Sequence, residues 1–161
     1  SDTCSFRFVR GRAETFRMGA RLIEAGADPW KIQEGLYQSV STDAPQLFSR
    51  ATDRMKLVGG GKVVLVWFES GALDGLQLDR DDHRDLIQFL ISQQGVLAAV
   101  TVTERAKDDF KLSFRSRKGV NVQPIAKRFG GGGHAQACGA TLSLPEASLR
   151  EQLEREVGHI A

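Results

Sequence analysis

The sequence predicts an α/β protein in which a helical linker segment is followed by a mixed-sheet α/β domain. Apolar residues recur at helical spacing over about residues 14–25, whereas from Lys62 onward short β-rich runs alternate with helical ones. The chain has 161 residues, of which 41% are hydrophobic, so it is long enough to bury a real core. These observations together predict leading helices and then a sheet covered by helices.

Three helices are predicted in the leading segment, over about residues 14–25, 28–40 and 44–57. Gly26 follows the first helix as a stop signal, and Asp28 caps the second, with Pro29 in its first turn. The triple glycine at residues 59–61 is expected to end the third helix.

Strands are predicted over about residues 62–69, 97–103, 110–116 and 137–144, and helices over about 81–94, 122–129 and 145–157. The first of these strands, KVVLVWFE, is apolar enough to be largely buried. In the strand at 110–116, phenylalanine and leucine alternate with polar residues. Arg115 is therefore expected on the face opposite the core.

Acidic residues are missing between Phe110 and Pro145, although the net charge of the whole chain is only +2. The same stretch contains six cations: Lys111, Arg115, Arg117, Lys118, Lys127 and Arg128. A local positive field of this kind favours an anionic ligand. The alternative is a solvated basic face without a ligand.

The two cysteines and the hydropathy of the chain indicate a cytoplasmic setting. Cys4 and Cys138 lie far apart and form neither a CxxC nor a disulfide-framework pattern, so no disulfide is expected. No apolar run approaches the roughly 18 to 20 residues that cross a bilayer. The first ten residues do not have the layout of a signal peptide.

Four consecutive glycines and a histidine follow the helix predicted at 122–129. Because glycine lets the backbone approach a ligand and turn its N–H groups inward, this run predicts a loop that encloses an anion. A histidine at the end of the loop adds a charge-assisted donor for a phosphate oxygen. We therefore predict ligand contacts from Gly130, Gly131, Gly132, Gly133, His134 and Gly139. The alternative is a flexible loop with a surface histidine.

Arg115 lies in the segment Ser-Phe-Arg-Ser-Arg-Lys, which is the second candidate for ligand contacts. A guanidinium group can fork onto a phosphate or stack on a base, and a strand end holds it more rigidly than a loop. Arg117 and Lys118 follow it and are predicted to contribute to the same site. The alternative is an outward-facing strand arginine without a ligand.

Asp2 could be a metal ligand only if the other ligands of the metal came from elsewhere. Otherwise it is expected to belong to a frayed terminus. The glycines at 59–61 are followed by Lys62 and Val63, without the Ser or Thr of a P-loop, and therefore predict a turn.

Asp81 and Asp82 predict helix capping rather than a metal site, and His83 beside them is expected to be a bystander. No Ser/His/Asp or Cys/His catalytic set can be assigned from spacing. The sequence therefore predicts a ligand-binding site without catalytic residues.

These motifs resemble a known family. The run FGGGGHAQACG, preceded by KLSFRSRKGVNVQPIAKRF, resembles the DHH-associated domain of the DHH phosphoesterase superfamily. Within it the chain is most similar to the bacterial oligoribonuclease and pAp phosphatase enzymes. The opening DTCSFRF and the later AGADP resemble the end of the catalytic DHH domain and its connecting helix. Cys4 departs from the glycine expected there.

The resemblance implies three parts: the end of a catalytic DHH domain at 1–10, a helical connector at 11–60 and a substrate-binding DHH-associated domain at 61–161. The catalytic domain is expected to hold a manganese pair that activates water. Carried over by position, Asp2 corresponds to a metal ligand, residues 131–134 to phosphate contacts and Arg115 to a nucleotide contact. Because the earlier motifs are missing from this sequence, these 161 residues alone are expected to be inactive.

The resemblance therefore implies the substrate-binding part of a manganese-dependent phosphoesterase, a hydrolase with exonuclease activity. The expected partners are short single-stranded RNA or DNA oligonucleotides and nucleotides such as pAp, with no membrane and with a homodimer left open. One alternative is part of a cyclic-dinucleotide phosphodiesterase, which shares this domain. The other is a stand-alone nucleic-acid-binding module.

Overall fold

The computed structural model describes residues 13–37 and 40–160, and these form two compact units divided after Val40. The predictions for Asp2, for Cys4 and for the segment 1–10 lie outside the described residues. Within the described residues, no helix combines the length and the apolar character needed to span a membrane.

The first unit contains helices α1 (Ala13–Glu24) and α2 (Pro29–Tyr37), which confirms two of the predicted helices. Gly26 ends α1 with a backbone φ of 91°, and its N–H donates to Ile23 O at 2.9 Å. The carboxylate of Asp28 accepts hydrogen bonds from the N–H groups of Trp30 and Lys31, at 2.9 and 3.3 Å. Both signals read from the sequence therefore work as helix boundaries.

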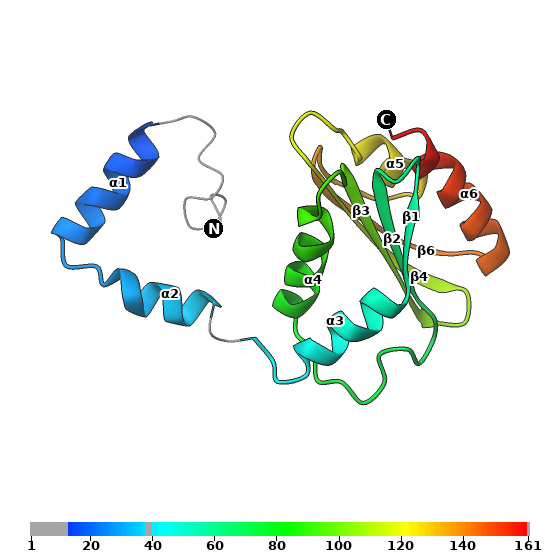
Figure 1. Ribbon diagram of the computed structural model, residues 1–161, viewed down its shortest axis with the longest axis horizontal. Coiled ribbons are helices and arrows are strands. Elements are labelled where there is room, and N and C mark those ends of the chain that lie inside the picture. The colour runs from blue at the N-terminus through cyan, green and yellow to red at the C-terminus, as the bar shows by residue number, and fades with distance from the viewer. Residues whose placement is uncertain (1–12, 38–39, 161) are drawn as a thin grey trace. The chain divides into compact units, whose positions relative to one another are not determined.

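The second unit, residues 41–161, is built on a six-stranded sheet with the strand order β1-β2-β3-β4-β6-β5. Its strands are β1 (Met55–Val58), β2 (Val63–Phe68), β3 (Ala98–Ala106), β4 (Asp109–Ser116), β5 (Gly132–His134) and β6 (Ala137–Ser143). Its helices are α3 (Ala44–Asp53), α4 (Arg80–Ser92), α5 (Gln123–Arg128) and α6 (Glu146–Gly158). Only β2 and β3 pair in parallel, and α4 connects them. Figure 1 shows α3 and α4 on one face of the sheet and α5 and α6 on the other.

Strand β2 is buried along its whole length because helices cover it on both faces. Val63, Leu65 and Trp67 belong to the core under α5 and α6, and the alternate residues belong to the core under α3 and α4. A strand that is buried on both faces has a continuous apolar sequence. This is why the run KVVLVWFE predicts the strand correctly.

The helix predicted over 44–57 is wrong in its last turn. The structure ends α3 at Asp53, and the residues of β1 pair antiparallel with β2. The glycines at 59–61, with φ of 57°, 64° and 83°, connect the two strands as a hairpin loop. This confirms a turn in place of a P-loop, because a strand follows the glycines. Both α3 and β1 pack in the same unit as the sheet, although the sequence-based division placed them in the connector.

Asp79, rather than Asp81 or Asp82, is the N-cap of α4, where it forms a capping box with Asp82. Asp82 is 1% exposed and accepts hydrogen bonds from Asp79 N at 3.0 Å and Ser41 N at 3.2 Å. Burial raises the pKa of this carboxyl, but the hydrogen bonds outweigh burial and the pKa is lowered. The predicted capping role is confirmed, with the cap moved by two residues.

We expect Asp82→Asn to lower the free energy of unfolding by about 1–3 kcal/mol at pH 7, because one buried N–H then faces an amide donor. A carboxyl with a lowered folded-state pKa stabilises the fold above about pH 4, and this contribution is lost as the pH falls further. The difference between the variant and the wild type should therefore shrink toward pH 3. Urea denaturation at both pH values measures it. Asp85→Asn, which breaks only a surface ion pair, is the control, and an equal loss in both variants would contradict the assignment.

Candidate functional site

Arg115 and His134 lie in one row across the sheet. Ala137 of β6 is paired with Arg115 of β4 on one side and with His134 of β5 on the other. Directly paired residues project to the same face, and each step between strands is about 4.8 Å. The two side chains predicted to bind a ligand therefore rise from the same face, with their backbones roughly 10 Å apart.

The neighbouring row of the same face contains Thr101, Ser113, Gly139 and Gly132, in the order β3, β4, β6, β5. Alternate residues of β4, such as Phe114, are fully buried in the core under α5 and α6, so these rows belong to the opposite face. We call the surface formed by Thr101, Thr103, Lys111, Ser113, Arg115, Gly132, His134 and Gly139 the open face. The predicted placement of Arg115 opposite the core is confirmed.

Most glycines of the predicted site are required by the fold itself. Gly130 has φ 74° and ends α5, while the N–H of Gly131 donates to Ala126 O at 2.8 Å, as in a Schellman motif. A Cβ on Gly131 would lie 2.0 Å from Gly139 O. Similar close contacts, of 2.6 and 2.7 Å to backbone oxygens, would arise at Gly133 and Gly139. Packing of the chain against itself therefore explains four of the five glycines.

Gly132 is the exception. Its φ is outside the left-handed region, and a Cβ built on it would meet nothing within 4 Å. It is exposed and lies on the open face, in the edge strand β5, where it pairs with Gly139. Nothing in the fold requires a glycine here, so the missing side chain leaves space for a ligand to approach the backbone.

The prediction of an anion-enclosing loop is wrong in its geometry. Residues Gly132–His134 form the edge strand β5, whose backbone pairs with β6, and the side-chain amide of Gln123 donates to Gly133 O. Glycine has a low strand propensity, so the sequence does not predict this strand. Pairing with β6 determines the conformation, and His134 is held at the end of a strand instead of a loop.

Of the six cations in the acid-free stretch, only Lys111 and Arg115 lie on the open face. Arg117 donates to Gln93 O at 2.8 Å, and Lys118 is exposed in the turn that follows β4. Lys127 and Arg128 belong to α5 on the other face, where Arg128 is paired with Glu156. The positive segment of the sequence is therefore divided between two faces of the sheet.

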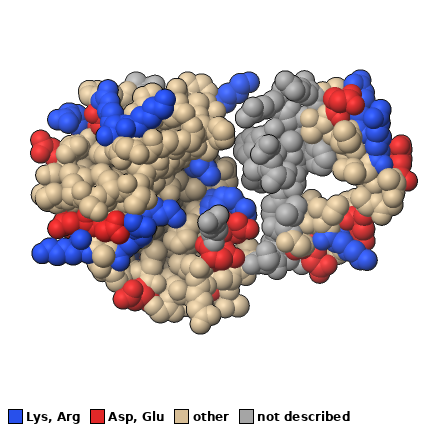
Figure 2. Space-filling model, turned by 180° about the vertical axis from the view of Figure 1, so that it is seen from behind, with Lys and Arg blue, Asp and Glu red and all other residues tan. Residues whose placement is uncertain are grey.

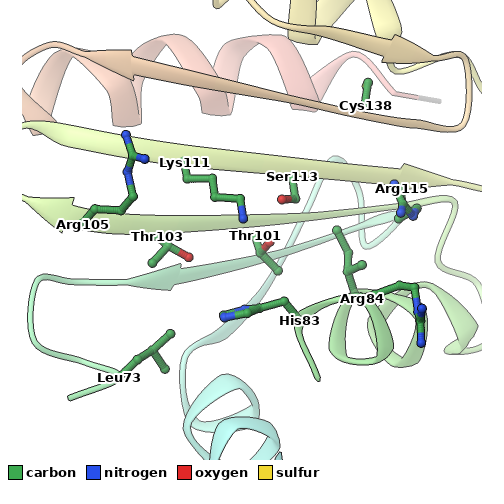
Figure 3. Close-up of a pocket in the computed structure, with 11 residues that line it drawn as sticks. Leu73, His83, Arg84, Thr101, Thr103, Arg105, Lys111, Ser113, Arg115 and Cys138 are labelled. Atoms are coloured by element: carbon green, nitrogen blue, oxygen red, sulfur yellow. The ribbon is translucent and has the colours of Figure 1, made fainter. Parts of the chain in front are cut away.

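A groove of about 360 Å³ lies between α4 and strands β3 and β4 (Figure 3). Four cations line it: Arg84, Arg105, Lys111 and Arg115. Two of these are neutralised in part, since Arg84 pairs with Asp81 and Asp85 and Arg105 pairs with Asp109 at 2.8 Å. Among the described residues no carboxylate lines the groove itself. It is therefore a positively charged depression that is continuous with the open face.

His83 lines this groove, so its interpretation as a bystander is not supported by the geometry. Figure 3 shows His83 and Lys111 projecting into the same space, from α4 and from β4. Burial and the charge of Lys111 lower the pKa of His83, against smaller opposing effects of Asp82 and Asp79. The imidazole is therefore neutral near pH 7. Ile87 lies four residues after His83 on α4 and is buried, and this spacing indicates that His83 is on the side of the helix that faces the sheet.

Cys138 borders the groove but does not offer a reactive thiol. It pairs with Phe114 in the register of β6 and is buried in the core under α5 and α6. Burial raises the pKa of its thiol, although nearby Arg115 acts in the opposite direction. Figure 3 accordingly shows Cys138 on the side of the sheet away from the groove.

The described residues do not fit a manganese site. No three His, Cys, Asp or Glu side chains in residues 13–37 and 40–160 are grouped so that they could hold a metal ion. Asp82, next to the groove, is occupied by backbone hydrogen bonds of the α4 cap. The arrangement can bind and orient an anion through its own cations and hydroxyl groups.

Charge on the side of the molecule drawn in Figure 2 does not form one large basic patch. Lysine and arginine side chains are interspersed there with aspartate and glutamate. A surface of this kind gives little non-specific attraction for nucleic acid. The distribution of charge on this side therefore does not by itself mark a binding surface.

Comparison with known proteins gives consistent matches. The model of the DHHA1 domain matches residues 60–157. The chain is 32% identical to the bifunctional oligoribonuclease and PAP phosphatase NrnA of Thermus thermophilus, over 96% of this chain and 48% of that protein. It is 31% identical to the cyclic-di-AMP phosphodiesterase GdpP of Geobacillus thermodenitrificans, over 98% of this chain and 23% of that protein.

A solved structure shows the same fold. An exopolyphosphatase-related protein from Bacteroides fragilis superposes with a TM-score of 0.85 at 20% identity, over 97% of this chain and 46% of that one. The chain therefore spans about half the length of the first relative and of this structure, and about a quarter of the phosphodiesterase.

Proposed function

Because the chain belongs to the DHHA1 domain family, a domain associated with phosphoesterases, we propose that it binds the nucleotide substrate of a phosphoesterase on its open face. The observation that carries this proposal is the row Arg115–Ala137–His134, with the open backbone at Gly132 beside it. Arginine forks onto a phosphate, and a histidine N–H donates to a phosphate oxygen. A ligand that lies over Gly132 contacts both side chains.

The names of the relatives support a nucleotide as the class of substrate. One is named for oligoribonuclease and PAP phosphatase activity, and the first choice for this chain is therefore a short oligonucleotide or pAp. The other is named for cyclic-di-AMP and matches 98% of this chain, so a cyclic dinucleotide is the second candidate. Both substrates carry phosphodiester or phosphomonoester groups, which the open face recognises in the same way.

Manganese is proposed because of the family resemblance, and the described residues themselves do not form a site for it. We propose that a catalytic domain supplies the ligands of the metal pair, which would activate water when bound. The chain described here would hold and orient the phosphate that is attacked. The predicted cytoplasmic location stays a prediction, and so does the homodimer that the sequence leaves open.

The 161-residue chain is expected to bind the 5′-phosphorylated dinucleotide pApA without hydrolysing it. One candidate ligand such as Asp2 cannot assemble a two-metal site. Fluorescence anisotropy measures the binding, and chromatography of the products after incubation with manganese measures hydrolysis. Binding of pApA with no new products supports the proposal. Absence of pApA binding, or manganese-stimulated hydrolysis that persists in Asp2→Ala, would contradict it.

A further inference from the structure

Four polar side chains form a compact block on the open face, along the groove. Thr101 of β3 is directly paired with Ser113 of β4, and Thr103 is directly paired with Lys111. Paired residues have their Cβ atoms about 5 Å apart, and successive residues on one face of a strand are about 7 Å apart. We call these four residues the hydroxyl–lysine cluster. Three hydroxyl groups and one ammonium group thus rise from a block whose Cβ atoms span about 5 Å by 7 Å.

None of the four side chains makes a hydrogen bond or ion pair with another residue in the described part of the chain. The three hydroxyl residues are half-buried, whereas Lys111 is exposed. Their polar atoms are accessible from the groove, because Trp67 Nε1 is the one buried polar side-chain atom without a partner in the described residues. The cluster therefore has its full capacity to donate hydrogen bonds to a ligand in the groove.

The surroundings hold these donors in place, and the lining of the groove in the described residues contains no carboxylate that would compete with an anionic ligand. The residues that alternate with them, Val100, Val102 and Leu112, are buried in the core beneath the sheet. Their strands are central in the sheet, so the positions of the four Cβ atoms are rigid. His83 closes the opposite wall of the groove, and in the described residues no carboxylate lines it.

We propose that the hydroxyl–lysine cluster binds a second phosphate of the nucleotide chain whose first phosphate contacts Arg115 and His134. Hydroxyl and ammonium donors with no lining carboxylate suit a phosphodiester anion. Ser113 is two residues from Arg115 on the same face of β4, roughly 7 Å along the strand. The two sites are therefore adjacent, and a continuous nucleotide chain can occupy both. The inference rests on the proposed function of the open face.

The test compares AMP, which carries one phosphate, with pApA, which carries two. Lys111→Gln should weaken binding of pApA about tenfold and Thr103→Val about threefold, while binding of AMP changes less than about twofold in each variant. Arg115→Ala should weaken both ligands. Lys127→Gln, on α5 at the other face, is the matched control and should bind both ligands like the wild type. Isothermal titration calorimetry gives the affinities, and thermal melting confirms that each variant is folded.

Three outcomes would overturn the inference, and they separate it from the proposed function. In the first outcome, Lys111→Gln and Thr103→Val bind pApA like the wild type, while Arg115→Ala binds both ligands more weakly. The proposed function then stands, but the second phosphate site is disproved. In the second outcome, Lys111→Gln weakens binding of AMP and of pApA equally. The cluster then binds the first phosphate and not a second one. If Arg115→Ala and His134→Ala bind both ligands like the wild type, the proposed function fails and the inference fails with it.

Discussion

Arg115→Ala is expected to weaken binding of pApA by about ten- to a hundredfold. The guanidinium lies on the open face, at the end of β4, in one row with His134. A charge-assisted hydrogen bond typically contributes about 1.5–3 kcal/mol, which corresponds to this range of affinity. Because neutralising a phosphate releases counterions, the salt dependence of binding should also become flatter. Anisotropy titrations at two salt concentrations measure both effects.

Arg117→Ala is the matched control, because Arg117 follows two residues later and its guanidinium is bound to Gln93 O at 2.8 Å. It removes the same charge but lies away from the row of Arg115 and His134. Its affinity for pApA should stay within about threefold of the wild type, as expected for a charge that is not in contact with the ligand. Equal losses in the two variants would show that binding depends on overall charge and not on the open face.

Two neighbouring glycines are expected to respond in opposite ways to the same substitution. Gly131→Ala should lower the free energy of unfolding by about 2–3 kcal/mol, because the new Cβ would lie 2.0 Å from the backbone oxygen of Gly139. Gly132→Ala should leave stability within about 1 kcal/mol, since its Cβ would meet nothing within 4 Å. Only Gly132→Ala should weaken pApA binding in a fully folded protein, because its methyl group occupies the space of the ligand.

Chemical denaturation and anisotropy, applied to both variants, test this pair. A stable Gly131→Ala would mean that β5 is not packed against β6 as described. Wild-type binding by Gly132→Ala would mean that the ligand does not lie over this position. Gly60→Ala provides a reference, because this glycine is also in open space but in the hairpin loop between β1 and β2, with φ 64°. It should lose a little stability through backbone strain and no affinity.

The parts of the fold that could be predicted are those whose own residues carry a pattern typical of a helix or a strand. The buried strand β2 is a continuous apolar run, and α4 begins at a cluster of aspartates. Strands β1 and β5 could not be predicted, since four residues after a helix and a run of glycines carry no strand pattern. Their conformation comes from antiparallel pairing with the next strand along the chain, β2 for β1 and β6 for β5, across a short turn in each case.

The candidate site was predictable in its residue types but not in its arrangement. Arg115 and the glycine–histidine run were recognised, yet the row that joins Arg115 to His134 depends on the register of three strands. The groove beside it depends on where α4 crosses the sheet, which brings His83 opposite Lys111. Spacing within the sequence contains neither of these relations. The six cations of one segment likewise separate onto two faces only when the sheet forms.

A phosphorylated nucleotide that binds on the open face should shift the backbone amide signals of that face during a titration with pApA. The largest changes in two-dimensional NMR spectra are expected at Arg115, Gly132 and His134, with smaller changes at Thr103 and Lys111. Residues of α5, including Lys127, should be unaffected because they lie on the other face of the sheet. Changes concentrated on α5 and α6, with the open face unchanged, would show that the nucleotide binds on the other face of the sheet.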